Sequence, residues 1–147
     1  MNKGIWILLV IMAGAMLPIQ AGLNTRMGKV LDSPSWATLI SFIVGAIGML
    51  AYVAVNREAL ILGSVKSAPA HLWVAGLLGA FYVTVMVLAF PRLGPALTFG
   101  LAVAGQLLIS LLLDHFNLLV PHPHPINLYR ILGILLIISG VVIIRKF

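Results

Sequence analysis

Residues 4–24 read GIWILLVIMAGAMLPIQAGLN and contain no charged side chain. A helix needs about 20 mostly apolar residues to cross the hydrocarbon core of a bilayer, so this run is long enough to span. Four more apolar runs follow near 35–55, 70–90, 95–113 and 127–145. None shows the apolar/polar alternation of a transmembrane barrel strand. The sequence therefore predicts an all-α membrane protein, with five transmembrane helices forming one domain over residues 1–147.

The composition also indicates that lipid is the solvent of this chain. Hydrophobic residues make up 62% of the sequence and charged residues 8%, whereas a soluble domain typically carries about 25% charged residues. The net charge of +6 comes from single basic residues between apolar runs, which is typical of membrane-edge anchors and not of a nucleic-acid surface. Residues 1–22 resemble a signal peptide, but the membrane-embedded remainder leads us to expect a retained first span.

The basic residues divide almost evenly between the two sides of the predicted spans. A clear imbalance orients a membrane protein, so this sequence predicts insertion in both orientations, unless Arg92 and Arg130 lie too deep to count or lipid interactions decide. Five spans place the termini on opposite sides, and two oppositely inserted copies form an inverted repeat. We expect an antiparallel homodimer or a dimer with an oppositely inserted paralogue. The N-terminal side holds Lys3, Arg57, Lys66 and Arg130, and the other side holds Arg26, Lys29, Arg92, Arg145 and Lys146.

Polar residues within the spans are the candidates for a binding site, because lipid cannot satisfy them. Gln106 lies near the middle of the fourth span, and Ser110 and Asp114 follow at intervals of one turn. They either line a cavity or hydrogen-bond between packed helices. In the first span, Gln20 and Asn24 are four residues apart and share a helix face.

Pro18 precedes these two amides and removes one helical hydrogen bond. It predicts a break in the first span that either bends or unwinds the helix and presents the amides inward, or makes a simple kink.

The two aspartates next to spans have different surroundings. Asp32 precedes Ser33, which can cap the second span, and Pro34, which suits its first position, so Asp32 is expected to be structural. Asp114 ends a helix, where the helix dipole disfavours an anion. We therefore expect Asp114 to have a cationic or hydrogen-bond-donating partner, and His115 and Arg130 lie on the same side.

Metal and cofactor sites are not predicted. The segment PHPHP, residues 121–125, contains His122 and His124, but these point about 120° apart in a polyproline helix. The chain has no cysteine to complete a metal site. Arg92, in the turn FPRLGPA, either attracts an anionic substrate or snorkels to lipid headgroups. Small residues predict close helix contacts at Gly45 and Gly48, Gly76 and Gly79, Gly100 with Ala104, and Gly133 with Gly140.

Four segments together resemble the YdcZ-like family of the drug/metabolite transporter superfamily: QAGLNTRMGKVLDSPSWATLISFIVGAIGML, GLLGAFYV, FPRLGPALTFGLAVAGQLLISLLLDHF and RILGILLIISGVVII. The resemblance covers essentially the whole chain. Its most specific patterns are matched by Gln20 and Asn24, by Ser41 with Phe42 and Gly45, and by Gly105 and Gln106 with Asp114, His115 and Phe116. Family members occur as single genes, gene pairs and fused double-length chains, which fits an antiparallel dimer.

The resemblance implies helical transport of small molecules. The related small multidrug resistance transporters carry a glutamate in their first span, but this chain offers Gln20 there. A polar or neutral substrate bound by amides and hydroxyls is therefore expected.

We predict a bacterial inner-membrane transporter that works by alternating access, and no enzyme. A regulatory or assembly subunit of a larger membrane complex is the alternative. The predicted cavity residues are Gln20, Asn24, Ser41, Gln106 and Ser110, and the predicted pathway edge comprises Asp114, His115 and Arg92.

Overall fold

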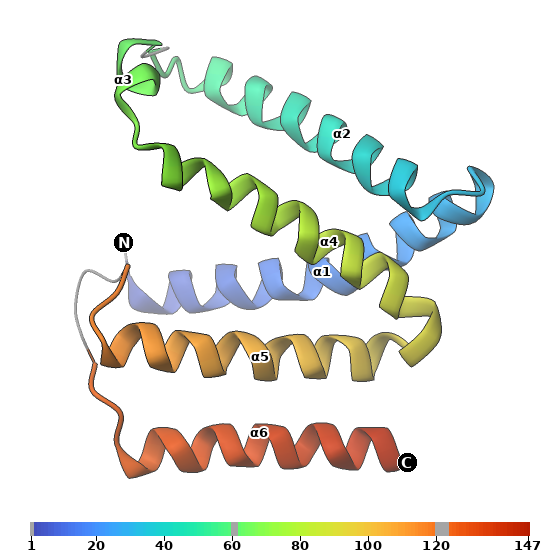
Figure 1. The fold of residues 1–147 in the computed structure, drawn as a ribbon, viewed down its shortest axis with the longest axis vertical. Coiled ribbons are helices and arrows are strands. Elements are labelled where there is room, and N and C mark those ends of the chain that lie inside the picture. The colour runs from blue at the N-terminus through green and yellow to red at the C-terminus, as the bar shows by residue number, and fades with distance from the viewer. Residues whose placement is uncertain (1, 60–61, 120–123) are drawn as a thin grey trace. The chain divides into compact units, whose positions relative to one another are not determined.

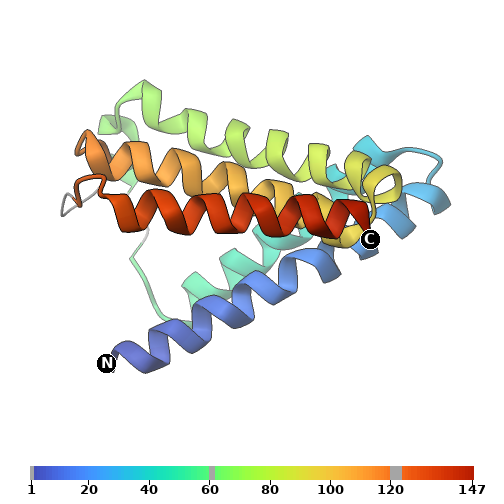
Figure 2. The same ribbon diagram turned by 90° about the horizontal axis from the view of Figure 1, so that it is seen from below.

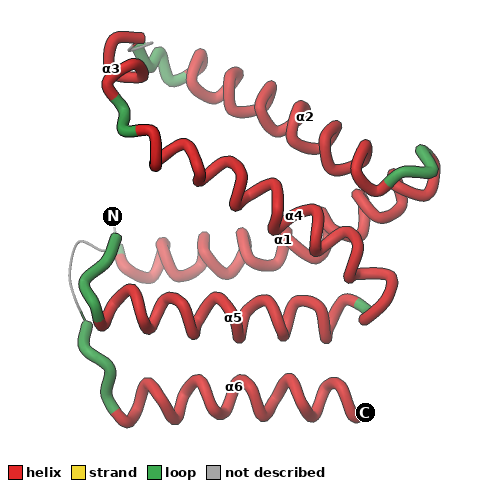
Figure 3. The backbone as a smooth tube through the Cα atoms, viewed as in Figure 1, coloured by secondary structure: helices red, strands yellow, loops and turns green. Residues whose placement is uncertain are grey.

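The regular structure is helical throughout the described part of the chain (Figures 1 and 3). The computed structural model describes residues 2–59, 62–119 and 124–147. Five segments there are long and apolar enough to cross a membrane, with Ala70–Leu93 counted as one. This finding confirms the predicted five-helix membrane architecture. The elements are α1 (Lys3–Val30), α2 (Pro34–Val55), α3 (Leu62–Ser67), the 3-10 helix η1 (Ala70–Trp73), α4 (Val74–Leu93), α5 (Pro95–His115) and α6 (Leu128–Lys146).

The chain forms two compact units, residues 1–92 and 93–147. In the first unit, α1 and α2 run antiparallel from a short turn, and α4 crosses α1 near the end of α1 (Figure 1). In the second unit, α5 and α6 lie side by side and antiparallel along their length (Figures 1 and 2). Each unit therefore contains a packed helix pair, α1 with α2 and α5 with α6.

The start of α2 confirms the predicted cap. Ser33 is the N-cap residue, its Oγ accepts the Trp36 N–H at 3.3 Å, and Pro34 occupies the first turn. The end of α1 differs from the prediction, because the helix continues from residue 24 to Val30. Arg26 and Lys29 are exposed within this extension. Long basic side chains reach water from the end of a helix, and their positive charge interacts favourably with the negative end of the helix dipole. The helix can therefore continue through Arg26 and Lys29.

Pro18 lies inside α1, and the helical assignment is uninterrupted on both sides of it. The unwound form of the predicted break is therefore wrong, and the bend or simple kink at Pro18 stays a prediction. The remaining hydrogen bonds of a 28-residue helix support the chain on either side of the missing one. Gln20 and Asn24 consequently lie in the helix and not in an irregular segment.

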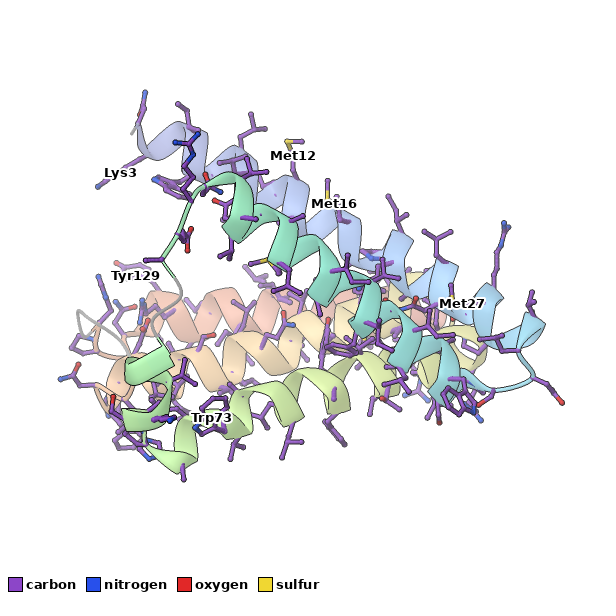
Figure 4. All side chains as sticks on the ribbon, turned by 90° about the horizontal axis from the view of Figure 1, so that it is seen from above. Lys3, Met12, Met16, Met27, Trp73 and Tyr129 are labelled. Atoms are coloured by element: carbon purple, nitrogen blue, oxygen red, sulfur yellow. The ribbon has the colours of Figure 1, made fainter. Side chains whose placement is uncertain are left out.

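Very few apolar side chains are buried. Figure 4 shows Met12 and Met16 projecting from α1, and their side chains are 49% and 60% exposed. In each candidate span at most 11% of the most apolar window is buried. Lipid tails rather than a protein core must cover such a surface. The buried apolar residues of the described part are Ala21, Ala37, Met86, Val87, Ala104 and Val141.

Close contact at a glycine is found at Gly100. A Cβ placed there would lie 3.0 Å from Val141 Cγ2, and the neighbouring Ala104 is also buried. This site confirms the expected small-residue contact and joins α5 to α6. The expected close contacts are not seen within the described part of the chain at Gly45, Gly48, Gly76, Gly79, Gly133 and Gly140, where an added Cβ would meet nothing within 4 Å.

The α5–α6 contact predicts unequal effects for two glycine substitutions on the same helix. Gly100→Leu should destabilise the protein by about 1–3 kcal/mol because the new side chain overlaps Val141. Gly105→Leu is the control, since an added Cβ there meets nothing within 4 Å. Thermal unfolding of both variants in detergent measures the difference. Equal unfolding midpoints would show that the close approach at Gly100 does not support the helix pair.

Candidate functional site

A polar cluster of three residues lies between α1 and α2. Gln20 and Asn24 are one turn apart on α1, and Ser41 lies about two turns into α2. Asn24 is only 4% exposed, and its Nδ2 donates to Ser41 Oγ at 3.2 Å. An amide without a partner in an apolar medium costs several kcal/mol. The Asn24–Ser41 bond therefore connects the two helices at a position where lipid offers no substitute.

Several other Ser and Thr hydroxyls of the helices are satisfied in a different way. Each of five donates to the carbonyl oxygen four residues earlier in its own helix or at the start of that helix, at 2.7–3.1 Å. Such hydroxyls are neutralised locally and are poor candidates for binding. Ser41 instead accepts a bond from another helix, and its hydroxyl proton has no acceptor within the described part of the chain. The five residues are Thr25, Thr38, Thr84, Thr98 and Ser139.

The cluster borders two grooves of the first unit. One has a volume of about 330 Å³ and lies between α1 and α2, and Gln20, Asn24 and Ser41 all line it. The other has about 380 Å³ and is lined by Gln20, Ser41 and Gly45, with Val83 from α4. The remaining lining residues of both grooves are apolar or glycine. A few polar groups in a mostly apolar concavity are typical of a small-molecule site.

These grooves show that three of the five predicted cavity residues come together. Gln20 and Asn24 line one groove from the same side, which confirms that they share a face of α1. The other two, Gln106 and Ser110, belong to the second unit. Ser110 lines a groove of about 260 Å³ between α5 and α6, whereas Gln106 is exposed on α5 and is not among the residues lining that groove.

Asp114 has the cationic partner expected from the sequence. Its Oδ2 lies 2.9 Å from an Arg130 guanidinium nitrogen, and both side chains are about one-third exposed or less, at 26% and 32%. Arg130 also donates to the His124 carbonyl oxygen at 2.7 Å. The Asn127 cap accepts the Arg130 backbone N–H at 2.9 Å. The ion pair therefore joins the end of α5 to a firmly capped start of α6.

His115 does not pair with Asp114. Its Nδ1 accepts the Ile126 N–H at 3.4 Å, and its ring contacts Phe116 edge to face at 4.9 Å between centroids. His115 thus supports the connection between α5 and α6 while Arg130 neutralises the carboxylate.

Metal ligands are not gathered in the described part of the chain, where no group of three His, Cys, Asp or Glu side chains is found. In the segment PHPHP, His122 and its neighbours 121 and 123 lie outside the described residues.

A further groove of the first unit was missed by the sequence analysis. It brings Arg92, which was predicted at the pathway edge, next to Lys29 and Asp32. Thr25, Gly28 and Lys29 follow the spacing of one face of α1, and Asp32 comes two residues after the helix ends. That spacing was a usable signal, but only the fold shows that α4 brings Arg92 to the same face.

The ion pair predicts a measurable coupling between Asp114 and Arg130. Asp114→Asn and Arg130→Gln should each destabilise the protein, and the double variant should lose less than the sum. For a partly exposed pair the coupling free energy should be about 1 kcal/mol. A double-mutant cycle of unfolding free energies in detergent measures it. Strictly additive losses would show that the pair contributes nothing.

Residues 5–143 match the family described as "Putative inner membrane exporter, YdcZ". The chain is also 26% identical to the inner membrane protein YdcZ of Escherichia coli strain K12 over 153 residues, covering 99% of each chain. No solved structure matches the chain. The family description names a membrane exporter and not a class of enzyme. Together with the five apolar helices, these matches identify a multi-pass inner-membrane protein that belongs to the YdcZ family.

Proposed function

We propose that this chain exports a small polar solute that binds at the Gln20–Asn24–Ser41 cluster. The observation that carries the proposal is Asn24, which is almost fully buried in a membrane helix and bonded to Ser41 across the α1–α2 contact. Gln20, one turn away, borders both grooves without a hydrogen-bond partner within the described part of the chain. A solute that supplies such partners would bind here in preference to lipid.

The chemistry of the cluster favours a neutral substrate. Amides and a hydroxyl offer both donors and acceptors but no formal charge. The chain contains only three acidic residues, Asp32, Glu58 and Asp114. Asp32 and Glu58 lie outside the helices of the first unit, and Asp114 is paired with Arg130. A cationic substrate bound beside Gln20 would therefore find no carboxylate within the spans of the first unit to act as its counterion.

The dimer and the alternating-access cycle are part of this proposal. Exposed amides such as Gln20 and Gln106 are costly against lipid tails, and a second copy would offer them partners or a hydrated cavity. The nearly even division of basic residues and the odd number of spans suit an antiparallel arrangement. Rocking of the two copies about the cluster would then expose it to each side in turn.

Substitutions in the cluster should strongly reduce export. In cells expressing the chain, compounds released into the medium are compared with those of cells that lack it by untargeted mass spectrometry. Gln20→Ala and Asn24→Ala should each lower this release about tenfold or more, because each removes a hydrogen-bonding group from an apolar site.

Ser139→Ala is the matched control, since the Ser139 hydroxyl bonds to the Leu135 carbonyl of its own helix. It should retain release at equal expression in the membrane. Wild-type release of every exported compound by both cluster variants would refute the site.

Insertion in both orientations can be tested because the chain contains no cysteine. Single cysteines at Asn2 and, separately, at Lys146 are labelled with a membrane-impermeant thiol reagent before and after permeabilisation. Each should label about half from outside if the copies insert both ways. One fixed sidedness for each site would exclude the antiparallel homodimer and favour an oppositely inserted paralogue or a subunit of a larger complex.

A further inference from the structure

A cavity of about 430 Å³ lies where α1 ends, α2 begins and α4 ends. All of its lining residues belong to the first unit. Its walls are joined by specific contacts. Thr25 Oγ1 lies 3.5 Å from the Val87 carbonyl oxygen, and a Cβ placed on Gly28 would lie 3.2 Å from Pro34 Cα. This cavity is separate from the grooves at the Gln20–Asn24–Ser41 cluster, which share none of its lining residues.

Two cations border the cavity, and neither is neutralised by a carboxylate. Lys29 approaches from the last turn of α1 and Arg92 from the last turn of α4. Asp32 also lines the cavity, but the ion pair found in the described part of the chain is the one between Asp114 and Arg130. One Arg92 N–H donates to the Leu88 carbonyl oxygen. A guanidinium has five N–H donors, so the others remain for a ligand.

The balance of charges at the cavity is positive. Lys29 and Arg92 contribute two full positive charges, and Asp32 subtracts one. The ends of α1 and α4 each add about half a negative charge, and the start of α2 returns about half a positive charge. The sum is about half of a positive charge within a partly apolar cavity, where electrostatic interactions are stronger than in water.

We propose that this cavity binds a phosphate group or a similar oxyanion, with Lys29 and Arg92 as its ligands. The guanidinium fork and the ammonium group together suit the several acceptor oxygens of such a group. The oxyanion has two sources at this position, a phospholipid headgroup at the membrane edge and a small solute in the adjoining water. This proposal does not depend on transport or on the solute site at Gln20, Asn24 and Ser41. The negative charge of Asp32 would lower the affinity of the cavity for the oxyanion.

The test uses the full chain in dodecyl maltoside and Tris buffer, which contain no phosphate. One arm adds inorganic phosphate, and the other adds phosphatidylglycerol with diacylglycerol as its phosphate-free control. The shift in unfolding midpoint with concentration gives the apparent affinity. Lys29→Gln and Arg92→Gln should each weaken binding about tenfold, since each removes a charge-assisted hydrogen bond.

Two further variants separate oxyanion binding from general effects of charge and folding. Arg26→Gln removes a charge from the same end of α1 but not from the cavity lining, so it should leave the affinity within about twofold. Asp32→Asn should tighten binding about threefold or more by removing the opposing charge. Asn tolerates the positive φ of 51° at this position, and no misfolded protein would bind more tightly.

Binding in the phosphatidylglycerol arm alone identifies a headgroup as the source, and binding in the phosphate arm identifies a soluble oxyanion. Either result supports the proposal when Lys29 and Arg92 are required. The proposal is overturned if neither probe shifts the midpoint, if diacylglycerol acts as well as phosphatidylglycerol, or if Arg26→Gln weakens binding as much as Lys29→Gln.

Discussion

The hydrocarbon core of a bilayer offers no hydrogen-bonding partner, and the structure of this chain depends on that constraint. A backbone in lipid must satisfy its own polar groups, which a helix does within one segment. The regular structure of the described residues is accordingly helical, including α1 around Pro18. The same constraint acts on side chains, because five Ser and Thr hydroxyls bond to a carbonyl oxygen of their own helix or of the residue that caps it.

Polar groups that are not satisfied within their own helix stand out against this background. Asn24 needs Ser41 of a second helix, and Gln20 borders the same groove beside them. An apolar pair at these positions would join the helices with less desolvation cost. These amides are the reason for the proposal that a polar solute binds at this cluster.

Charged groups are also costly in lipid, and they lie at the ends of the helices. Asp114 and Arg130 neutralise each other where α5 ends and α6 begins. Lys29 and Arg92 lie in the last turns of α1 and α4. Their positive charges interact favourably with the negative ends of the helix dipoles, and their side chains can reach water. The chain therefore has an uncharged polar cluster inside the spans and positive charge at their edge.

The sequence alone predicted the number and type of the helices, the Ser33 cap and a cationic or hydrogen-bond-donating partner for Asp114. These features depend on local hydrophobicity, on capping and on helix dipoles, which short segments determine by themselves. It did not predict that α1 continues to Val30. The residue at which a helix ends depends on whether the side chains of its last turns can reach water. Nor did the sequence choose between Arg130 and His115 as the partner of Asp114, or place Arg92 beside Lys29. Those decisions belong to the tertiary structure, because they depend on distances between residues that are far apart in the chain and that only helix packing brings together.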